Sequence, residues 1–259
     1  MKHQPFKSLL PLFCAEFIGT AALCFAGLSM VIFNWGSGSI LKPLMPGWVL
    51  RLISGFLFGT IGCLIGLSRV GKISGAHINP AMSLAFYLQG KMAPGACTGY
   101  IVCQMFGAAA GCLPLLYIWG QWGASVKYGM TEVGNAGISV AFLGEILSTI
   151  CLVIVVFIFV GNKKLRNYTP YTMPFLYCIM VWAEAPLSGT SNNPARSFGP
   201  ALISYNFQNF WIYIVAPLLG AAIVVLLFKV FRVHRLLHIK SARISFHDAE
   251  THPDLQAQQ

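Results

Sequence analysis

Charged side chains are scarce in this chain of 259 residues: Asp, Glu, Lys and Arg fill 9% of positions, and only seven residues are acidic. A soluble domain carries about 25% charged residues, so a water-facing surface of ordinary composition is excluded. Hydrophobic residues instead make up 56% of the chain. The composition therefore predicts an integral membrane protein.

The chain also lacks the residue clusters that metal, disulfide or catalytic chemistry needs. Its eight cysteines include no Cys-x-x-Cys pair and no histidine at ligand spacing, and they fall in or beside apolar runs, which is typical of buried free thiols. No Ser/His/Asp or His/Cys constellation appears. We therefore expect no cofactor, no metal and no enzymatic activity. The net charge of +10 comes from loops between apolar runs, so we expect no nucleic acid partner.

Six apolar runs have about the length that crosses a bilayer, where roughly 20 residues span about 30 Å of hydrocarbon. We predict one transmembrane helix for each run, in residues 9–33, 48–67, 96–118, 139–160, 171–187 and 210–231. Most basic residues fall in loops on one side of this threading, so the positive-inside rule places both termini in the cytoplasm. These residues are Lys2, Lys7, Arg69, Lys72, Lys163, Lys164, Arg166, Lys229, Arg232, Arg235, Lys240 and Arg243.

Two polar phrases interrupt the apolar pattern, SGAHINPAMS at 74–83 and SGTSNNPARS at 188–197. Each follows the second apolar run of its half and precedes the third, which divides the chain into repeats of about 8–125 and 138–235. Three spans per repeat turn the second repeat upside down relative to the first. We predict a single membrane domain, residues 1–235, followed by a cytoplasmic tail, residues 236–259.

Each Asn-Pro-Ala triplet begins an apolar stretch of about ten residues, which makes roughly 15 Å of helix, half a bilayer. Asn is a favoured N-cap and Pro a favoured first helical residue, so helices are predicted to start at Asn79-Pro80 and Asn193-Pro194. Irregular backbone at membrane depth is tolerated where it is buried in protein or lines water. The predicted fold class is an all-α membrane protein with six transmembrane helices plus two re-entrant half-helices in an inverted repeat, with a pore or binding site at the midplane.

On these residues the chain resembles the aquaporin, or major intrinsic protein, family of water and small-solute channels. SGAHINPA and SGTSNNPARSFGPAL carry the resemblance, which covers about residues 8–231 and is to a bacterial-type member. It implies a homotetramer in a lipid bilayer, the inner membrane of a bacterium, and one pore per monomer for water and small neutral solutes. The implied pore motifs are Asn79, Pro80, Ala81, Asn193, Pro194 and Ala195.

The resemblance also implies a selectivity filter with four corners. Val181, Thr190 and Arg196 carry over by counting from the second triplet, and the fourth corner is Phe58 or Gly59, according to where one extra residue near GLSRVGK is placed. Water-specific members have His where this chain has Val181, and glycerol-type members have Asp after the arginine, which this chain lacks. We expect a water channel whose filter is wide and apolar.

Three acids lie within the apolar runs. The resemblance implies that Glu16 and Glu145 accept hydrogen bonds from the re-entrant loops and that His77 is a hydrogen-bonded wall residue, while Glu184 either anchors the second loop or titrates. Two alternatives stay open. One is a glycerol or small-solute facilitator of the same family, and the other is an ion- or proton-coupled transporter that uses the three glutamates.

Overall fold

The structure is a computed structural model that describes residues 6–233, 236–239, 241 and 242. Helices dominate this part of the chain, and five helical stretches are long and apolar enough to cross a membrane. The first runs without a break from α1 (Phe6–Ala22) through a π-helical turn, η1 (Leu23–Gly27), into α2 (Leu28–Trp35). The others are α3 (Gly47–Leu67), α6 (Pro94–Ala124), α7 (Ile138–Gly161) and α10 (Phe210–Val230).

The sixth predicted span is α8 (Thr169–Ser188), whose composition differs from that of the other five. Its 20 residues include three prolines and Glu184. These residues lower its mean hydropathy, so α8 is long enough to span but does not count among the five most apolar stretches. Glu184 is buried, because α8 packs against α3 and α7 and a carboxyl group facing lipid would be costly.

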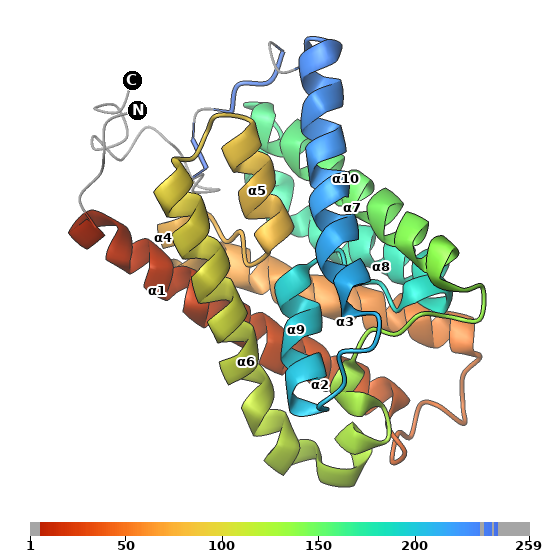
Figure 1. The fold of residues 1–259 in the computed structure, drawn as a ribbon. Helices are drawn as coiled ribbons and strands as arrows, with labels where there is room; N and C mark the ends of the chain where they lie inside the picture. The colour runs from red at the N-terminus through yellow and green to blue at the C-terminus, as the bar shows by residue number, and fades with distance from the viewer. Residues whose placement is uncertain (1–5, 234–235, 240, 243–259) are drawn as a thin grey trace.

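Two short helices, α5 (Pro80–Leu88) and α9 (Pro194–Ile203), lie beside α10, one in each half of the bundle (Figure 1). They contain 9 and 10 residues, which at 1.5 Å per residue is about half the hydrocarbon thickness. Both begin at the proline of an Asn-Pro-Ala triplet, as predicted. The remaining short elements are α4 (Arg69–Ser74), η2 (Lys127–Gly129) and η3 (Arg166–Tyr168).

The two repeats interlock. Within each repeat the first and last long helices are in contact, α1 with α6 and α7 with α10, and the second helices α3 and α8 pack on each other. Each half-helix also packs on the last long helix of the opposite repeat, α5 on α10 and α9 on α6. The arrangement is the predicted all-α fold, with long helices around two half-helices that belong to an inverted repeat.

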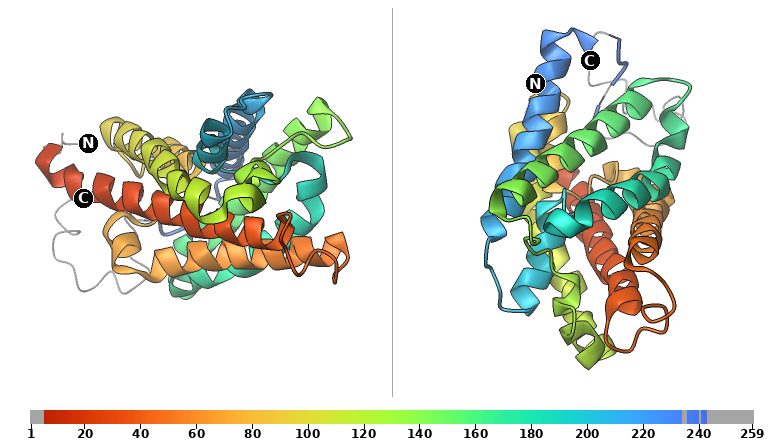
Figure 2. Two further views of the ribbon diagram at one scale, coloured as in Figure 1. Left: turned by 90° about the horizontal axis from the view of Figure 1, so that it is seen from below. Right: turned by 90° about the vertical axis from the view of Figure 1, so that its right-hand side faces the viewer.

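Glycines let the long helices cross closely, and the crossings are oblique (Figure 2). A Cβ atom at Gly55 of α3 would lie 2.3 Å from the carbonyl oxygen of Tyr177 in α8. A Cβ atom at Gly59 would lie 2.3 Å from the carbonyl oxygen of Met173. Small residues four apart bring helix backbones together in membranes, where packing replaces the hydrophobic effect. The contact between α1 and α6 uses the same spacing.

One side of the bundle collects the ends of α5, α7 and α10, and we call it the basic side. Lys229 Nζ, near the end of α10, donates to the Leu88 carbonyl at the end of α5 at 2.9 Å. The backbone N–H of His238 donates to the Gly161 carbonyl at the end of α7 at 2.7 Å. The basic residues in 163–166 follow α7 directly, so this side carries part of the predicted cytoplasmic charge.

The first residues of the predicted tail pack on the basic side. Ile239 and Ala242 are each 4% exposed, so these two residues of the predicted tail pack against the bundle. Four predicted cytoplasmic cations and the rest of the tail lie outside the described residues: Lys2, Arg235, Lys240, Arg243 and 244–259.

Replacing Gly59 with Ala should destabilise the crossing of α3 and α8, because the added methyl group meets backbone that cannot rotate away. We expect a loss of about 1–3 kcal/mol, the usual cost of overpacking, measured as a lower melting temperature in detergent. Gly62→Ala is the control, since nothing lies within 4 Å of a Cβ atom at Gly62 on the same helix. Equal melting temperatures for the two variants would contradict this account of the crossing.

Candidate functional site

The two half-helices begin at asparagines that cap them. Asn79 Oδ1 accepts a hydrogen bond from the N–H of Ala81 at 2.8 Å. Asn193 Oδ1 accepts from Ala195 at 3.0 Å and from Arg196 at 3.3 Å. The caps use N–H groups of each first turn, and the positive end of each helix dipole points at the centre of the bundle.

The asparagine side chains also join the two loops to each other. Asn79 Nδ2 donates to the carbonyl of Asn192 at 2.8 Å, and Asn193 Nδ2 donates to the carbonyl of Ile78 at 2.9 Å. These reciprocal bonds bring the two half-helix N-termini together. Each amide group has two N–H donors, so each keeps one N–H beyond the bond that holds the opposite loop.

Glu16, fully buried in α1, holds the loop before α5. Its Oε1 accepts from the N–H of His77 at 2.9 Å, and its Oε2 accepts from the N–H of Ile78 at 2.6 Å and from Gln104 Nε2 at 2.7 Å. Only an ionised carboxylate offers two oxygens that accept without donating. The carboxylate therefore supplies the partners that this non-helical backbone lacks at membrane depth.

Glu145, fully buried in α7, does the same for the second loop. Its two oxygens accept from the N–H groups of Ser191 and Asn192, both at 2.7 Å. Ser188 Oγ lies 2.5 Å from Glu145 Oε1 and also contacts Glu184 Oε1. One hydroxyl has one proton to donate, so the second contact needs a proton on a carboxyl group. Both Glu145 oxygens act as acceptors from backbone, which places that proton on Glu184.

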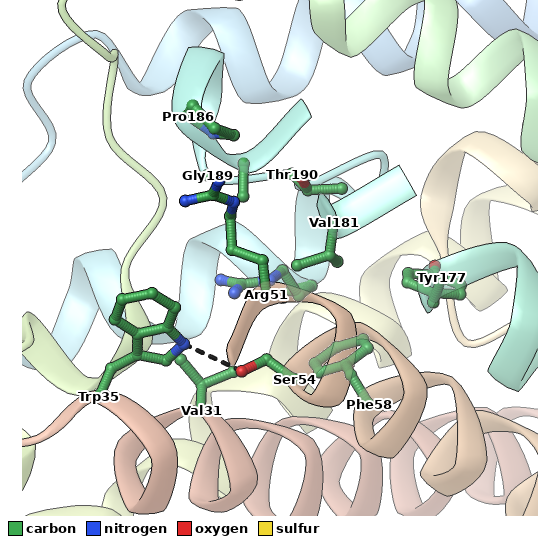
Figure 3. A pocket seen from close by; sticks show the side chains of 12 residues that line it. Val31, Trp35, Arg51, Ser54, Phe58, Tyr177, Val181, Pro186, Gly189 and Thr190 are labelled. Carbon is green, nitrogen blue, oxygen red and sulfur yellow. Dashed lines mark hydrogen bonds between the residues drawn. The ribbon is translucent and has the colours of Figure 1, made fainter. Parts of the chain in front are cut away.

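A cavity of about 310 Å³ lies between the end of α2, the first half of α3 and the second half of α8, away from the end of α10 (Figure 1 and Figure 3). We call it the outer cavity, and Phe58 of α3, Val181 of α8, Thr190 and Arg196 line it together. Ser54 also lines it and accepts from Trp35 Nε1 at 2.9 Å, the dashed bond in Figure 3. Most of its wall is therefore hydrocarbon and aromatic rings, with a few polar groups.

Arg196 is the buried one of the two arginines that line this cavity, the other being Arg51. It is 5% exposed, its Nη1 donates to the carbonyl of Gly129 at 2.7 Å, and its guanidinium lies 5.7 Å from the centre of the Phe58 ring. The first turn of α9 positions it, because Arg196 is the third residue of that helix. The guanidinium has five N–H donors in a planar fork, so several remain beyond the Gly129 bond.

A smaller cavity of about 100 Å³ reaches from the triplets toward the basic side, and we call it the inner cavity. Asn79, Asn193 and His77 line it, together with Met82. His77 is 5% exposed and stacks on the Phe86 ring at a centroid distance of 4.6 Å. The two asparagines therefore mark where the outer half of the molecule meets the inner half.

A sequence model described as Major intrinsic protein matches residues 5–228. The chain belongs to the major intrinsic protein family. It is 32% identical to Aquaporin NIP3-1 of Arabidopsis thaliana over 213 residues, 80% of this chain and 62% of that protein. It is 31% identical to Probable aquaporin TIP2-2 of Arabidopsis thaliana over 224 residues, 85% of this chain and 86% of that one.

The fold is also that of a solved member of the family. The X-ray structure of the aquaglyceroporin from Plasmodium falciparum superposes with a TM-score of 0.70 at 20% identity, over 88% of this chain and 99% of that chain. The major intrinsic protein described here is therefore an integral, multi-pass membrane channel and not an enzyme. In the described part of the channel, no group of three or more His, Cys, Asp or Glu side chains could hold a metal ion.

Of the two alternatives for the fourth corner of the channel's filter, Phe58 lies in the outer cavity with the other three residues. Gly59 lines the inner cavity and contacts the α8 backbone where the helices cross. Directly after α3, Ser68 caps α4 by accepting from the N–H of Gly71.

Sequence reasoning missed Tyr177, which lines both cavities of the channel. Its hydroxyl donates to Asn192 Oδ1 at 2.9 Å, and its ring lies 5.5 Å from that of Phe58. Residues four apart on a helix share a face. Tyr177 lies one turn before Val181, so the sequence could have predicted that it lines the same space. Phe58 lines both cavities as well, so the two rings lie where the cavities adjoin.

Replacing Glu145 with Gln should destabilise the channel, because the amide nitrogen would oppose one of the two backbone N–H donors. We expect a loss of about 2 kcal/mol, the scale of a hydrogen bond to a charged group, seen as a lower melting temperature in detergent. Glu184→Gln should stay near the parent, because a neutral amide resembles the protonated carboxyl group. Equal losses in the two variants would mean that Glu184 carries no proton.

Proposed function

We propose that this channel conducts water passively, passes some small neutral solutes, and excludes protons and ions. The observation that carries the proposal is the outer cavity, where Phe58, Val181, Thr190 and Arg196 face one space. Val181 offers neither a donor nor an acceptor, and it is smaller than the histidine of water-specific relatives. A filter with this corner is wider and less polar than one with histidine there. It should therefore exclude small neutral solutes less strictly than a histidine filter does.

Exclusion of ions rests on fixed positive charge along the same pathway. Arg196 lies in the outer cavity, and the positive ends of the α5 and α9 dipoles meet at the linked asparagines. Such charges repel cations, and donors at the centre orient a passing water so that its lone pairs face them. Asn79 and Asn193, with the triplet residues Pro80, Ala81, Pro194 and Ala195 behind them, are the proposed central contact.

The buried acids support a passive channel over a coupled transporter. Glu16 and Glu145 each accept two backbone N–H bonds from a re-entrant loop, so a change of protonation would disturb the loops themselves. Glu184 contacts Ser188 at the start of the second loop, which fits an anchor. A glycerol facilitator of the same family uses the same architecture, and the solute measurement below separates it from a water channel.

We further propose that the basic side faces the cytoplasm and that the protein forms a homotetramer in the bilayer. The orientation follows from the positive-inside rule applied to residues 163–166, Lys229 and Arg232. The tetramer follows from the family resemblance. Exposed apolar side chains on α8, including Phe175 and Trp182, are available for contact with lipid or with a neighbouring copy.

Val181→His should narrow the filter and add a polar group. We expect glycerol permeability to fall about fivefold relative to water permeability, which corresponds to about 1 kcal/mol in the barrier. Stopped-flow light scattering of matched proteoliposomes, with sucrose and glycerol as osmolytes, gives both rates. Val181→Leu narrows the filter without adding polarity, so it should lower both permeabilities. A ratio unchanged in the His variant would remove Val181 from the filter, and a parent that passes glycerol as readily as water would favour the facilitator.

Arg196→Val should weaken ion exclusion while leaving both half-helix dipoles in place. We expect a proton leak through the variant that rises by about tenfold, or about 1.4 kcal/mol in the barrier, measured with a pH-sensitive dye trapped in proteoliposomes. Arg51→Val is the matched control, since Arg51 lines the same cavity but donates through Nε to the carbonyl of Trp182. The same leak in both variants would show that general surface charge, and not Arg196, excludes protons.

A further inference from the structure

A short segment after α10 lies at the basic-side opening of the pathway. We call it the C-terminal strap, and it comprises Leu236–Ile239 with Ser241 and Ala242. Ala242 lines the inner cavity together with Asn79 and Asn193. The strap therefore reaches the space through which a solute would leave the central asparagines.

One end of the strap is bonded to the turn after α7. His238 donates its N–H to the Gly161 carbonyl at 2.7 Å, and Arg166 Nη2 donates to the His238 carbonyl at 2.9 Å. Arg166 Nε in turn donates to the Val160 carbonyl at 2.9 Å. A Cβ atom at Gly161 would lie 2.7 Å from Leu237 Cβ. Any larger residue at position 161 would therefore clash with the strap.

The other end is bonded on the α5 side of the opening. The Ala242 N–H donates to the carbonyl of Lys91, after α5, at 3.2 Å. The Ala242 carbonyl lies 3.1 Å from His77 Nε2. A carbonyl only accepts hydrogen bonds, so Nε2 carries the proton of this bond, and Nδ1 faces Ser83 Oγ at 3.1 Å.

Burial differs sharply along the strap. Ile239 and Ala242 are each 4% exposed and belong to the same apolar cluster as Phe86, Val160 and Phe228. Leu236 is 77% exposed. A segment that only trailed over the surface would not bury its side chains among helix residues of both repeats, so the strap is held by packing as well as by hydrogen bonds.

We propose that the C-terminal strap forms a second constriction, at the basic-side mouth of the channel. It is bonded to α7 and η3 on one side and to the loops around α5 on the other, and Ala242 borders the inner cavity. The strap residues thus limit what leaves the pore, in addition to the filter around Arg196. This inference rests on the proposed conduction of water and small solutes.

The test displaces the strap in the full-length channel. Ile239→Asp puts a charge where the side chain is buried, so the strap should leave its site, and water permeability per channel should rise about twofold or more once this constriction is lost. Leu236→Asp adds the same charge at an exposed position of the same segment and should match the parent. Stopped-flow rates in proteoliposomes at equal protein content give the comparison.

A second pair of variants tests the strap without a buried charge, so it stays informative if Ile239→Asp misfolds. Arg166→Ala removes the bond to the His238 carbonyl, and Lys164→Ala removes the same charge from an exposed neighbour in the same turn. We expect higher permeability only for Arg166→Ala. Hydrogen–deuterium exchange measures whether the strap is docked, independently of any transport assay. The His238 and Ala242 amides should be protected in the parent and in Leu236→Asp. They should exchange quickly in Ile239→Asp.

Fast exchange of both amides in the parent would overturn the strap while leaving the proposed function intact. Protected amides that become exposed in Ile239→Asp without any rise in permeability would overturn the constriction. A parent and variants that all conduct neither water nor glycerol above empty vesicles would instead overturn the proposed function, and the constriction with it. A silent parent with a conducting Ile239→Asp variant would support both proposals.

Discussion

Two stretches of non-helical backbone lie at membrane depth, and the rest of the molecule depends on how their N–H groups are satisfied. Hydrocarbon offers no hydrogen-bond partners, so each such group must find one inside the protein. Glu16 and Glu145 supply these partners, each accepting from two consecutive backbone N–H groups. Their ionised oxygens make stronger bonds than a neutral acceptor would, which compensates for burying charge between helices.

Once the loops are fixed, the pathway follows from local geometry. The bond from Asn79 to Asn192 and the bond from Asn193 to Ile78 set the distance between the half-helices. The direction of α9 then carries Arg196 into the outer cavity, because a residue in the first helical turn lies close to the capping asparagine. The tyrosine that separates the two cavities, Tyr177, is tied to the same loop through Asn192. Arg196, the two capping asparagines and the two supporting glutamates thus belong to one connected hydrogen-bonded unit.

Features that depend on neighbouring residues were predictable from the sequence. An Asn-Pro pair before an apolar stretch contains both the cap and the first helical residue, so the starts of α5 and α9 were predicted at Pro80 and Pro194. The bonds between asparagines more than 110 residues apart depend on how two loops meet, which spacing does not encode. The strap was missed for a related reason: the burial of Ile239 and Ala242 comes from packing with residues of α5, α7 and α10 that no local pattern reveals.

The residue that follows the Asn-Pro-Ala triplet differs between the two repeats, and the contacts above explain the difference. Met82 occupies the position in α5 that Arg196 occupies in α9, and it lines the inner cavity. If the channel rejects cations as proposed, a fixed positive charge on only one side of the asparagines is sufficient, because any ion that crosses must pass it. The inner half is therefore free to be apolar, and its wall holds Met82, Phe86 and Ala242 of the strap. An arginine in place of Met82 would bring a buried charge toward this apolar wall, where it would need partners that the strap's backbone alone does not supply.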